Sequence, residues 1–316
     1  MQFVECGLQR VLRERFRKKD AVNPQAPSAF LYIWVLNNLS MDIRFAIGKN
    51  ETKALDTNGL RENFLVSELF QADKLSLTYS HYDRMIIGGV LPVKKSITLS
   101  NPAELRAEYF LERRELGIIN IGGKGEVLVD GKKHSLKKME CLYVGKGAKK
   151  ITFSSSDKKA PAKYYLLSAP AHHAHPTKKF TKEDASPVEL GDASTSNKRT
   201  VYKYIHRDGI QSCQLVMGLT VLEKGSVWNS VPPHTHTRRM EVYLYFDLDA
   251  AQRLFHFMGE PQETRHIVMA NDEAVISAPW SMHFGSGTSN YSFIWGMAGE
   301  NLDYTDMDPA PIPTLK

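Results

Sequence analysis

The stretch VPPHTHTRRMEVYLYF, residues 231–246, has two histidines one residue apart and a glutamate five positions after the second. Alternate side chains of a β-strand point to the same face, so His234 and His236 would present both imidazoles to one side. A bulge or turn at the following Thr-Arg-Arg is needed before the carboxylate of Glu241 can join them. The spacing predicts a β-rich region that gathers three metal-ligating side chains.

The residues after Glu241 keep the alternation of a strand. Tyr243 and Tyr245 fall on one face, which we interpret as a polar interior. The intervening Val, Leu and Phe side chains fall on the other face, which we interpret as a packing surface.

A fourth ligand can come from a strand that is distant in sequence, because neighbours in a sheet need not be neighbours along the chain. His283 is the best candidate, since it follows an apolar strand and precedes a glycine-rich turn. A lone histidine is more often a hydrogen-bonded surface or core residue. An HxH pair with a carboxylate and a later histidine, all in one β-rich half, instead predicts a metal site.

Short strand-like runs separated by Gly-Gly, Asp-Gly and Gly-Lys-Gly turns fill most of the chain, and helix signals are scarce. Asp130-Gly131 predicts a β-hairpin, and Asp56 or Thr57 caps the best helix candidate, residues 56–66. The runs form two series, which predicts an all-β protein of two small barrels of similar build. The predicted parts are a poorly ordered N-terminal extension over 1–40, a first barrel over 41–171, a connector over 172–205 and a second, metal-binding barrel over 206–316.

Composition places the chain of 316 residues, 42% of them hydrophobic, in the ordinary globular class. Its three cysteines form no CxxC pair, so they predict neither a disulfide framework nor a cysteine zinc site, and they favour the cytoplasm. The net charge is +6, but half of the excess lies in residues 1–40. The remainder is too diffuse to predict nucleic-acid binding and is compatible with a small anionic substrate.

The apolar run at residues 29–36 follows a basic stretch, as a targeting segment would. It is too short to span a bilayer, where about 20 residues are needed, so no membrane association is predicted. Two prolines interrupt the region and no small-residue cleavage site follows, which argues against a signal peptide. Two glutamates disfavour a transit peptide, and we interpret residues 1–40 as an extension ahead of Met41.

Six motifs resemble those of one known family and together extend over about residues 41–310. They are YFLERRELGIINIGG, LYVGKGAK, PAHHAHPTKK, HTHTRRMEVYLYF, GEPQETRHIVMANDEAVISAPWSMHFG and FIWGMAGEN. The chain is similar to the 5-keto-4-deoxyuronate isomerase family of the cupin superfamily, although the glycine that usually precedes the cupin HxH is missing. The resemblance implies a bicupin of two jelly-roll-like β-barrels with few short helices. It also implies one zinc ion per subunit, held by His234, His236, Glu241 and His283.

The activity implied by the resemblance is that of a ketol-isomerase, an intramolecular oxidoreductase of pectin and polyuronate degradation. It would convert 4-deoxy-L-threo-5-hexosulose-uronate to 3-deoxy-D-glycero-2,5-hexodiulosonate, by proton transfer through an enediol or by direct hydride transfer. A divalent metal would stabilise the developing enediolate as a Lewis acid. The resemblance further implies a homohexamer.

Several residues are candidates for binding the uronate and for moving its proton. A substrate carboxylate favours a forked cation, and Arg238, Arg239 and Arg265 lie close in sequence to the ligands or on a neighbouring strand. Solvent-exposed strand edges carry arginines too, so this assignment is an expectation from type and position. The candidates for general acid or base are Tyr243, Tyr245, His266 and Glu263, and spacing does not select among them.

The first barrel contains no HxH pair. Its charged run, Glu-Arg-Arg-Glu at residues 112–115, is interpreted as a charged strand and turn without a metal set. We therefore expect the first barrel to be a degenerate cupin that supports the fold or an oligomer interface.

Three other functions fit parts of the same pattern. A 5-deoxy-glucuronate isomerase would share the cupin site and differ in its substrate, and the motifs ETRHIVM and HTHTRRMEV favour the hexosulose-uronate isomerase over it. A non-catalytic sugar-binding cupin would not need an intact ligand set. An iron oxygenase could use similar ligands.

Overall fold

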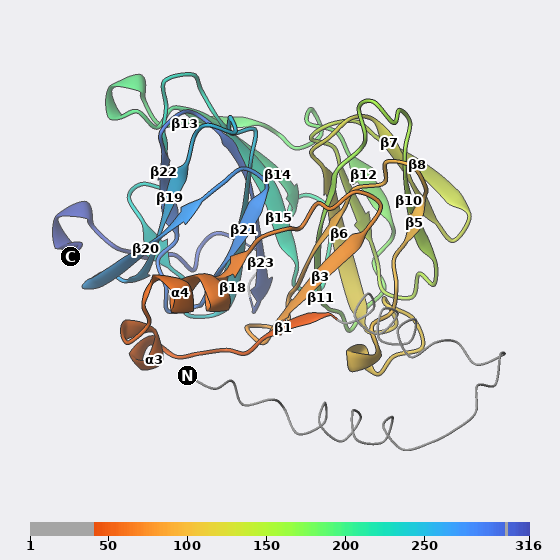
Figure 1. Ribbon diagram of the computed structural model, residues 1–316, viewed down its shortest axis with the longest axis horizontal. Coiled ribbons are helices and arrows are strands. Elements are labelled where there is room, and N and C mark those ends of the chain that lie inside the picture. Colours follow the sequence, from red (N-terminus) through yellow and green to blue (C-terminus); the bar gives the residue numbers. More distant parts are fainter. Residues whose placement is uncertain (1–40, 301–302) are drawn as a thin grey trace, which may run out of the picture. The chain divides into compact units, whose positions relative to one another are not determined.

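The computed structural model describes residues 41–300 and 303–316. The extension predicted over residues 1–40 lies outside this range. Strands make up most of the regular secondary structure of the described chain (Figure 1), and its helices are α3 (Lys49–Lys53), α4 (Thr57–Phe64) and three 3-10 turns, η1 (Ala103–Leu105), η2 (Ala193–Thr195) and η3 (Ile312–Thr314). The prediction of an all-β fold with few short helices is confirmed.

The first barrel pairs a seven-stranded sheet with a four-stranded sheet. In spatial order the larger sheet contains β1 (Asp42–Arg44), β3 (Leu75–Ser80), β4 (Ile86–Val90), β11 (Tyr164–Pro170), β6 (Arg114–Asn120), β9 (Cys141–Val144) and β12 (Lys178–Phe180). The smaller sheet contains β5 (Ile97–Thr98), β10 (Ile151–Ser155), β7 (Gly125–Val129) and β8 (Lys132–Leu136).

The second barrel repeats this plan. Its larger sheet contains β13 (Val188–Leu190), β14 (Arg199–Ile205), β15 (Val216–Leu222), β23 (Ser292–Gly299), β18 (Arg239–Phe246), β21 (Glu273–Ser277) and β2 (Leu65–Val66). Its smaller sheet contains β16 (Trp228–Asn229), β22 (Phe284–Gly287), β19 (Leu254–Glu260) and β20 (Glu263–Met269), and a two-stranded ribbon joins β17 (His234–Thr235) to β24 (Asp308–Pro309).

The internal duplication extends to the register of the central strands. β6 lies between β11 and β9 as β18 lies between β23 and β21. Each of the two strands begins with the second residue of an Arg-Arg pair, Arg114 in the first barrel and Arg239 in the second. When the strands are aligned on these arginines, Leu116 corresponds to Glu241. The two residues also have equivalent sheet partners, because Leu116 pairs with Val144 of β9 and Glu241 pairs with Ser277 of β21. An apolar residue thus replaces the metal-site carboxylate in the first barrel.

The local signals read from the sequence form the expected elements. Asp130 and Gly131 both have positive φ, 46° and 87°, and connect β7 to β8, with Val129 paired to Lys132. A two-residue turn with positive φ at both positions matches the twist of a hairpin. The side chain of Asp56 caps α4 by accepting a hydrogen bond of 2.8 Å from the backbone N–H of Gly59.

Two segments differ from the predicted division of the chain. Residues 172–205, expected to be a connector, contribute β12 to the first barrel and β13 and β14 to the second. In β14, Tyr204 and Ile205 are fully buried, because the run RTVYKYI carries the β-branched and aromatic residues of a strand despite its polar flanks. Helix α4 and β2, within the predicted first barrel, pack on β20 and β21 of the second.

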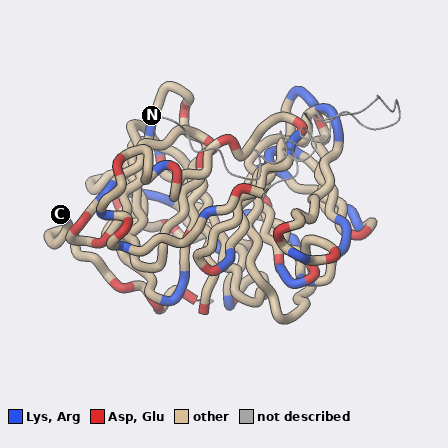
Figure 2. The backbone as a smooth tube through the Cα atoms, turned by 60° about the horizontal axis from the view of Figure 1, so that its bottom comes forward, with Lys and Arg blue, Asp and Glu red and all other residues tan. Residues whose placement is uncertain are grey.

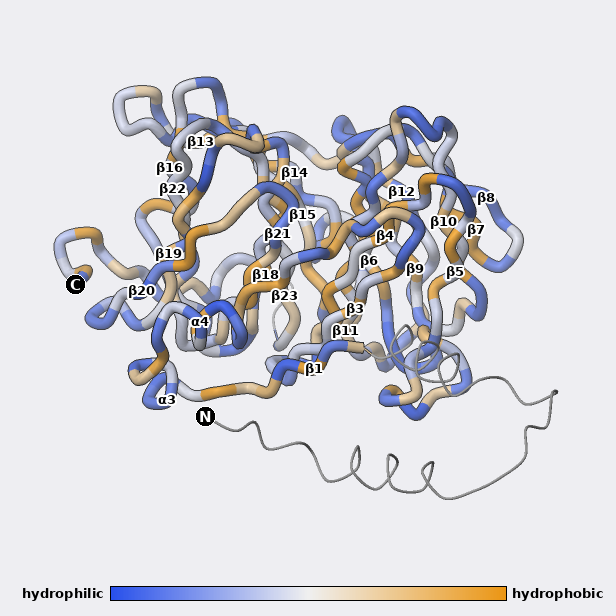
Figure 3. The backbone as a smooth tube through the Cα atoms, in the orientation of Figure 1, coloured by the Kyte–Doolittle hydropathy of each residue, from blue (hydrophilic) through white to orange (hydrophobic). Residues whose placement is uncertain are grey.

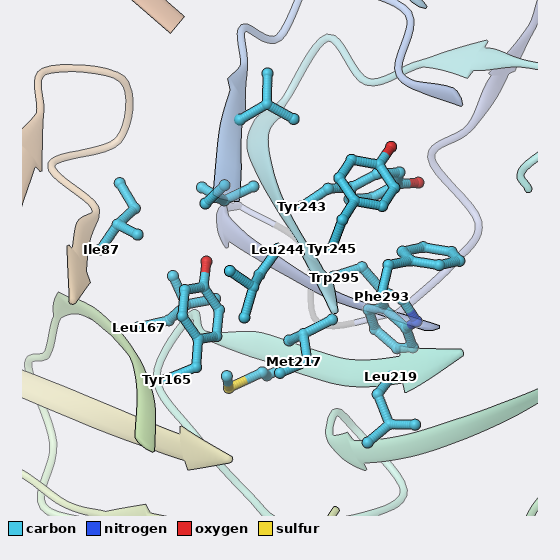
Figure 4. Packing of buried hydrophobic residues seen from close by; sticks show 14 of the residues in the cluster. Ile87, Tyr165, Leu167, Met217, Leu219, Tyr243, Leu244, Tyr245, Phe293 and Trp295 are labelled. Atoms are coloured by element: carbon cyan, nitrogen blue, oxygen red, sulfur yellow. The ribbon is translucent and has the colours of Figure 1, made fainter. Parts of the chain in front are cut away.

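The core is continuous between the two barrels, and most apolar segments fall on the strands (Figure 3). Tyr165 and Leu167 of β11 pack with Met217 and Leu219 of β15 in one cluster, which also holds Leu244 of β18 (Figure 4). The cluster leaves no room for a side chain at Gly117, where an added Cβ would lie 2.7 Å from the sulfur of Met217.

Glu115 connects the barrels through its buried carboxylate, which is 0% exposed. Its Oε1 accepts hydrogen bonds from the backbone N–H groups of Gln214 and Leu215, at 2.9 and 2.8 Å. Its Oε2 accepts from the backbone N–H of Cys213 at 2.7 Å and from the hydroxyl of Tyr143 at 2.8 Å. The run 112–115 does form a turn and a strand, but its last two residues are buried, because β6 packs between the barrel interior and the second barrel.

Lysines and arginines are interspersed with acidic residues over the described chain (Figure 2). Over the same residues, no helix is long and apolar enough to cross a membrane.

Candidate metal centre

Three segments of the second barrel bring the predicted ligands together. His234 lies in β17, His236 follows it directly, and a turn at Thr237 and Arg238 leads into β18, where Glu241 is the third residue. This is the turn that the sequence required between the histidines and the glutamate. His283 immediately precedes β22 in the opposite sheet. One ligand atom from each of the four residues lies within 4.8 Å of the others.

The imidazoles converge on one point through their Nε2 atoms. Nε2 of His234 lies 3.2 Å from Nε2 of His236 and 3.2 Å from Nε2 of His283. The Oε2 atom of Glu241 lies 2.6 Å from Nε2 of His283 and 3.4 Å from Nε2 of His236. Three nitrogens and one carboxylate oxygen, the donor set of many zinc and iron sites, therefore face one another.

The protonation states of His234 and Glu241 are those of metal ligands. Burial, together with the neighbouring His283, lowers the pKa of His234 to about 3, so its imidazole is neutral at physiological pH. Burial by itself would raise the pKa of Glu241, but His283 and His236 hold it well below its usual range, so the carboxylate is charged. A neutral imidazole and an ionised carboxylate are the forms that bind a metal.

One of the four donor atoms is not satisfied by protein groups, which fits a site for a cation. The Oε2 atom of Glu241 is buried and has no hydrogen bond of acceptable geometry. A buried carboxylate oxygen without a partner is costly. A cation between the four side chains would satisfy this oxygen and would receive the lone pairs of the three Nε2 atoms.

Asp306, which the sequence analysis did not identify, lies next to the cluster and approaches both His236 and Arg239. Its Oδ1 lies 2.7 Å from Nη2 of Arg239, and its Oδ2 lies 3.4 Å from Nδ1 of His236. Both Nδ1 of His236 and Oδ2 of Asp306 are buried without a hydrogen bond. Asp306 is held there by the C-terminal segment, in which β24 pairs with β17.

Aromatic and polar side chains line the barrel interior beside the cluster. The hydroxyls of Tyr243 and Ser230 are 2.9 Å apart, and that of Tyr245 lies 2.8 Å from Nδ1 of the fully buried His256. The ring of Tyr243 meets that of His283 edge-on, with centroids 5.5 Å apart. Burial raises the pKa of both tyrosines well above the usual value, so both phenols are protonated. These contacts agree with the polar interior predicted for this face of the strand.

The three candidate arginines have different surroundings. Arg239 is 1% exposed and paired with Asp306, whereas Arg238 is exposed in the turn. Arg265 in β20 pairs with Met258 of β19, two residues beyond the interior His256. Alternate residues share a face of a strand and opposed residues share a face of a sheet, so the side chain of Arg265 starts on the interior face. Its Nη2 donates to the carbonyl of Lys53 at 3.0 Å.

The remaining acid–base candidates lie on β20. His266 is opposite Phe257, with ring centroids 6.4 Å apart and the rings tilted by 52°, on the face that points away from His256. Glu263 is on the inner face but engages Arg265, with Oε1 2.8 Å from Nη1. The structure therefore groups Tyr243 and Tyr245 with the metal ligands and does not bring His266 to them.

Sequence reasoning missed Ser230, His256 and Asp306. Asp306 lies in an acidic C-terminal segment, DYTDMDP, and nothing in its spacing distinguishes it from its neighbours. His256 is a single histidine on a strand, and its burial beside Tyr245 follows only from the pairing of β19 with β22.

Comparison with known proteins finds one matching family and several relatives that share one name. Residues 64–311 match the KduI/IolB family. The chain is 54% identical over 276 residues to 4-deoxy-L-threo-5-hexosulose-uronate ketol-isomerase of Shouchella clausii (strain KSM-K16), covering 87% of this chain and 100% of that protein. Proteins of the same name from Halalkalibacterium halodurans and Yersinia pestis (strain Pestoides F) are 52% and 54% identical, over 85% and 87% of this chain and 97% and 100% of theirs.

Solved structures are similar in fold at much lower identity. An IolB-like protein from Salmonella typhimurium LT2 has a TM-score of 0.55 at 14% identity, covering 70% of this chain and 85% of that one. The oxalate decarboxylase formate complex of Lactobacillus farciminis has a TM-score of 0.50 at 9% identity, covering 71% and 79%. These likenesses concern the fold alone and agree with an all-β cupin architecture.

Proposed function

The chain belongs to the KduI/IolB family, and from this premise we propose that it is a ketol-isomerase acting on 4-deoxy-L-threo-5-hexosulose-uronate. Its product would be 3-deoxy-D-glycero-2,5-hexodiulosonate, formed in the degradation of pectin and other polyuronates. Support comes from relatives more than half identical over their whole or nearly whole length. The observation that carries the proposal is the four-residue cluster, because an aldose–ketose isomerisation needs groups that stabilise an enediolate.

We assign His234, His236, Glu241 and His283 as the ligands of one zinc ion per subunit. A divalent ion bound there would polarise the substrate's carbonyl and hydroxyl oxygens. The convergence of three Nε2 atoms on the unpartnered Oε2 of Glu241 supports this assignment.

The interior tyrosines have the position and protonation for handling the substrate's oxygens. Tyr243 is next to His283, and its phenol remains protonated because burial raises its pKa. It would donate a hydrogen bond to an oxygen on which negative charge develops. Tyr245, held by His256, would fix the adjoining wall of the site.

Among the arginines, Arg265 is our choice for the substrate carboxylate, because it lies opposite Met258 on the sheet face that also carries the interior His256. Glu263 would orient its guanidinium through their 2.8 Å ion pair. Arg239 would instead serve the site through Asp306. We also propose, from the family resemblance, that the protein is a cytoplasmic homohexamer.

Metal removal tests the proposed reaction. We expect chelation to abolish isomerisation of 4-deoxy-L-threo-5-hexosulose-uronate, and zinc or another divalent ion to restore it, without oxygen or a nucleotide. The measurement is substrate loss and product formation, with metal content determined in parallel. Full turnover by metal-free protein would contradict the proposed use of the metal.

The alternative substrate needs a separate assay, because the family name covers a second enzyme, IolB. The relatives that are 52–54% identical carry the ketol-isomerase name, whereas the IolB-like structure is 14% identical. We expect 5-deoxy-glucuronate to be the poorer substrate. A higher kcat/KM for it than for the hexosulose-uronate would reverse the assignment.

Substitution of Asp306 tests whether its carboxylate, which lies beside Nδ1 of His236, contributes to zinc binding. Asp306→Asn should weaken zinc binding by about 10- to 100-fold, as loss of a carboxylate behind a metal-bound histidine typically does. The measurement is zinc affinity by competition with a chromogenic chelator. Asp308→Asn is the matched control, since Asp308 lies in the same segment, is exposed and contacts Thr237. Equal zinc affinity in both variants would remove Asp306 from the site.

A further inference from the structure

Arg114 is a buried cation in the first barrel, 7% exposed. Its Nε donates to the hydroxyl of Ser168 at 3.1 Å, and its Nη2 donates to the carbonyls of Ser168 and Arg84, both at 2.6 Å. Within residues 41–300 and 303–316, no carboxylate forms an ion pair with it. The adjacent Glu115 points to the other face of the sheet, where it binds amides of the second barrel.

This guanidinium keeps its charge. Burial lowers the pKa of Arg114 only to about 10, so the group is cationic at neutral pH. A buried charge without a counter-ion is unfavourable, because neutral carbonyls replace only part of its hydration. The surroundings of Arg114 therefore favour an anion from outside the chain.

The second barrel shows what such an anion would be. Arg239 occupies the place in β18 that Arg114 occupies in β6, and it is neutralised by the carboxylate of Asp306 at 2.7 Å. Asp306 comes from the segment that follows β23. The segment that follows β11, the equivalent strand of the first barrel, reads AHHAHPT over residues 171–177 and contains no carboxylate.

Arg114 is one of the residues that line a cavity of about 320 Å³, and its guanidinium carbon lies 5.9 Å from the ring centroid of Tyr79, which also lines it. Arg113 and His81 add basic groups, Glu104 is the one acidic group in the lining, and Tyr79 is among its aromatic residues. Small-molecule sites begin at about 300 Å³. The cavity therefore has the size for a single sugar ring and a net positive lining.

We propose that this cavity binds a small organic carboxylate of monosaccharide size, whose carboxylate pairs with Arg114 as that of Asp306 pairs with Arg239. The planar guanidinium suits a carboxylate, and the aromatic wall suits the apolar face of a sugar ring. Glu104 would disfavour a second negative charge on the ligand. The site is separate from the metal centre, which lies in the other barrel, and its existence does not depend on the proposed reaction.

Calorimetric titration of the full-length, metal-loaded protein with D-glucuronate tests the proposal, with D-glucose as the neutral ligand of the same size. We expect glucuronate to bind and glucose not to bind. Arg114→Met should weaken glucuronate binding at least tenfold, as expected for loss of a charge-assisted hydrogen bond. Arg253→Met is the matched control, because the side chain of Arg253 donates to carbonyls of its own loop, those of Ala250 and Gln252.

Two further variants test whether glucuronate occupies this cavity and not the metal centre. Ala107→Trp should abolish binding by filling the cavity, since Ala107 lines it. The hydrogen bonds of Arg114, which go to Ser168 and Arg84, do not involve Ala107. Glu241→Gln, in the metal centre, should leave the binding that depends on Arg114 unchanged. The proposal is overturned if glucuronate binds no better than glucose. It is also overturned if Ala107→Trp binds like the wild type, or if Glu241→Gln alone abolishes binding.

Discussion

Replacing Glu241 with glutamine is expected to empty the metal centre and to lower isomerase activity by more than about 100-fold, since loss of groups behind a metal ligand alone costs 10- to 100-fold. Glutamine keeps the size and one oxygen of glutamate but removes the negative charge. In the structure that charge faces Nε2 of His283 at 2.6 Å and Nε2 of His236 at 3.4 Å. The measurement is bound metal per chain together with turnover.

Thr235→Val is the control for this experiment. Thr235 lies between the two histidines in sequence, and strand alternation directs its side chain away from the cluster. Its metal content and activity should match those of the wild type. A Glu241→Gln protein with a full complement of metal and normal turnover would show that the site is built on the histidines and some other fourth group.

Replacing Glu115 with alanine is expected to lower the free energy of unfolding by about 3–5 kcal/mol, the usual cost of breaking a buried charged network. The substitution removes the acceptor of three backbone N–H groups in the second barrel and of the Tyr143 hydroxyl, all within 2.7–2.9 Å. The N–H of Leu215 and the hydroxyl of Tyr143 then stay buried without this acceptor, at about 1–3 kcal/mol each, whereas the N–H groups of Cys213 and Gln214 are part-buried. Urea unfolding followed by far-ultraviolet circular dichroism measures the loss.

The matched control is Glu126→Ala, on β7 of the same barrel. Glu126 is part-exposed and lies 3.6 Å from Lys133, an ion pair of the kind worth less than about 1 kcal/mol. Glu115→Gln, which keeps one acceptor oxygen, should fall between the two. If Glu115→Ala were no less stable than Glu126→Ala, the carboxylate would not connect the barrels.

Local sequence patterns were sufficient where neighbouring residues determine the structure. The Asp130-Gly131 hairpin and the cap of α4 by Asp56 depend on residues within one turn. The alternation of Glu241, Tyr243 and Tyr245 predicted the interior face of β18, because a strand has a period of two whatever its partners. The turn at residues 237–238 followed from the same rule, since the glutamate could not otherwise reach the histidines.

The division of the chain was less predictable. Residues 172–205 have the composition of a surface connector, yet β12, β13 and β14 complete sheets of both barrels. Composition averages over the segment, whereas an edge strand needs only a few residues of suitable shape beside a free edge. That edge exists only after the rest of the sheet has formed.

The sequence by itself determined the strand-rich architecture, the HxH pair and the carboxylate that follows it, because these depend on periodicity and on residues close along the chain. Tertiary structure decided the fourth corner of the site, where β22 brings His283 to within 3.2 Å of His234 across 49 residues. It also decided that Asp306 lies beside His236, that Arg239 pairs with Asp306, and that Arg114 lines a cavity. The physical reason is that sheet pairing and burial join residues without regard to their separation in sequence, so the partners of a buried charge are known only when the chain has folded.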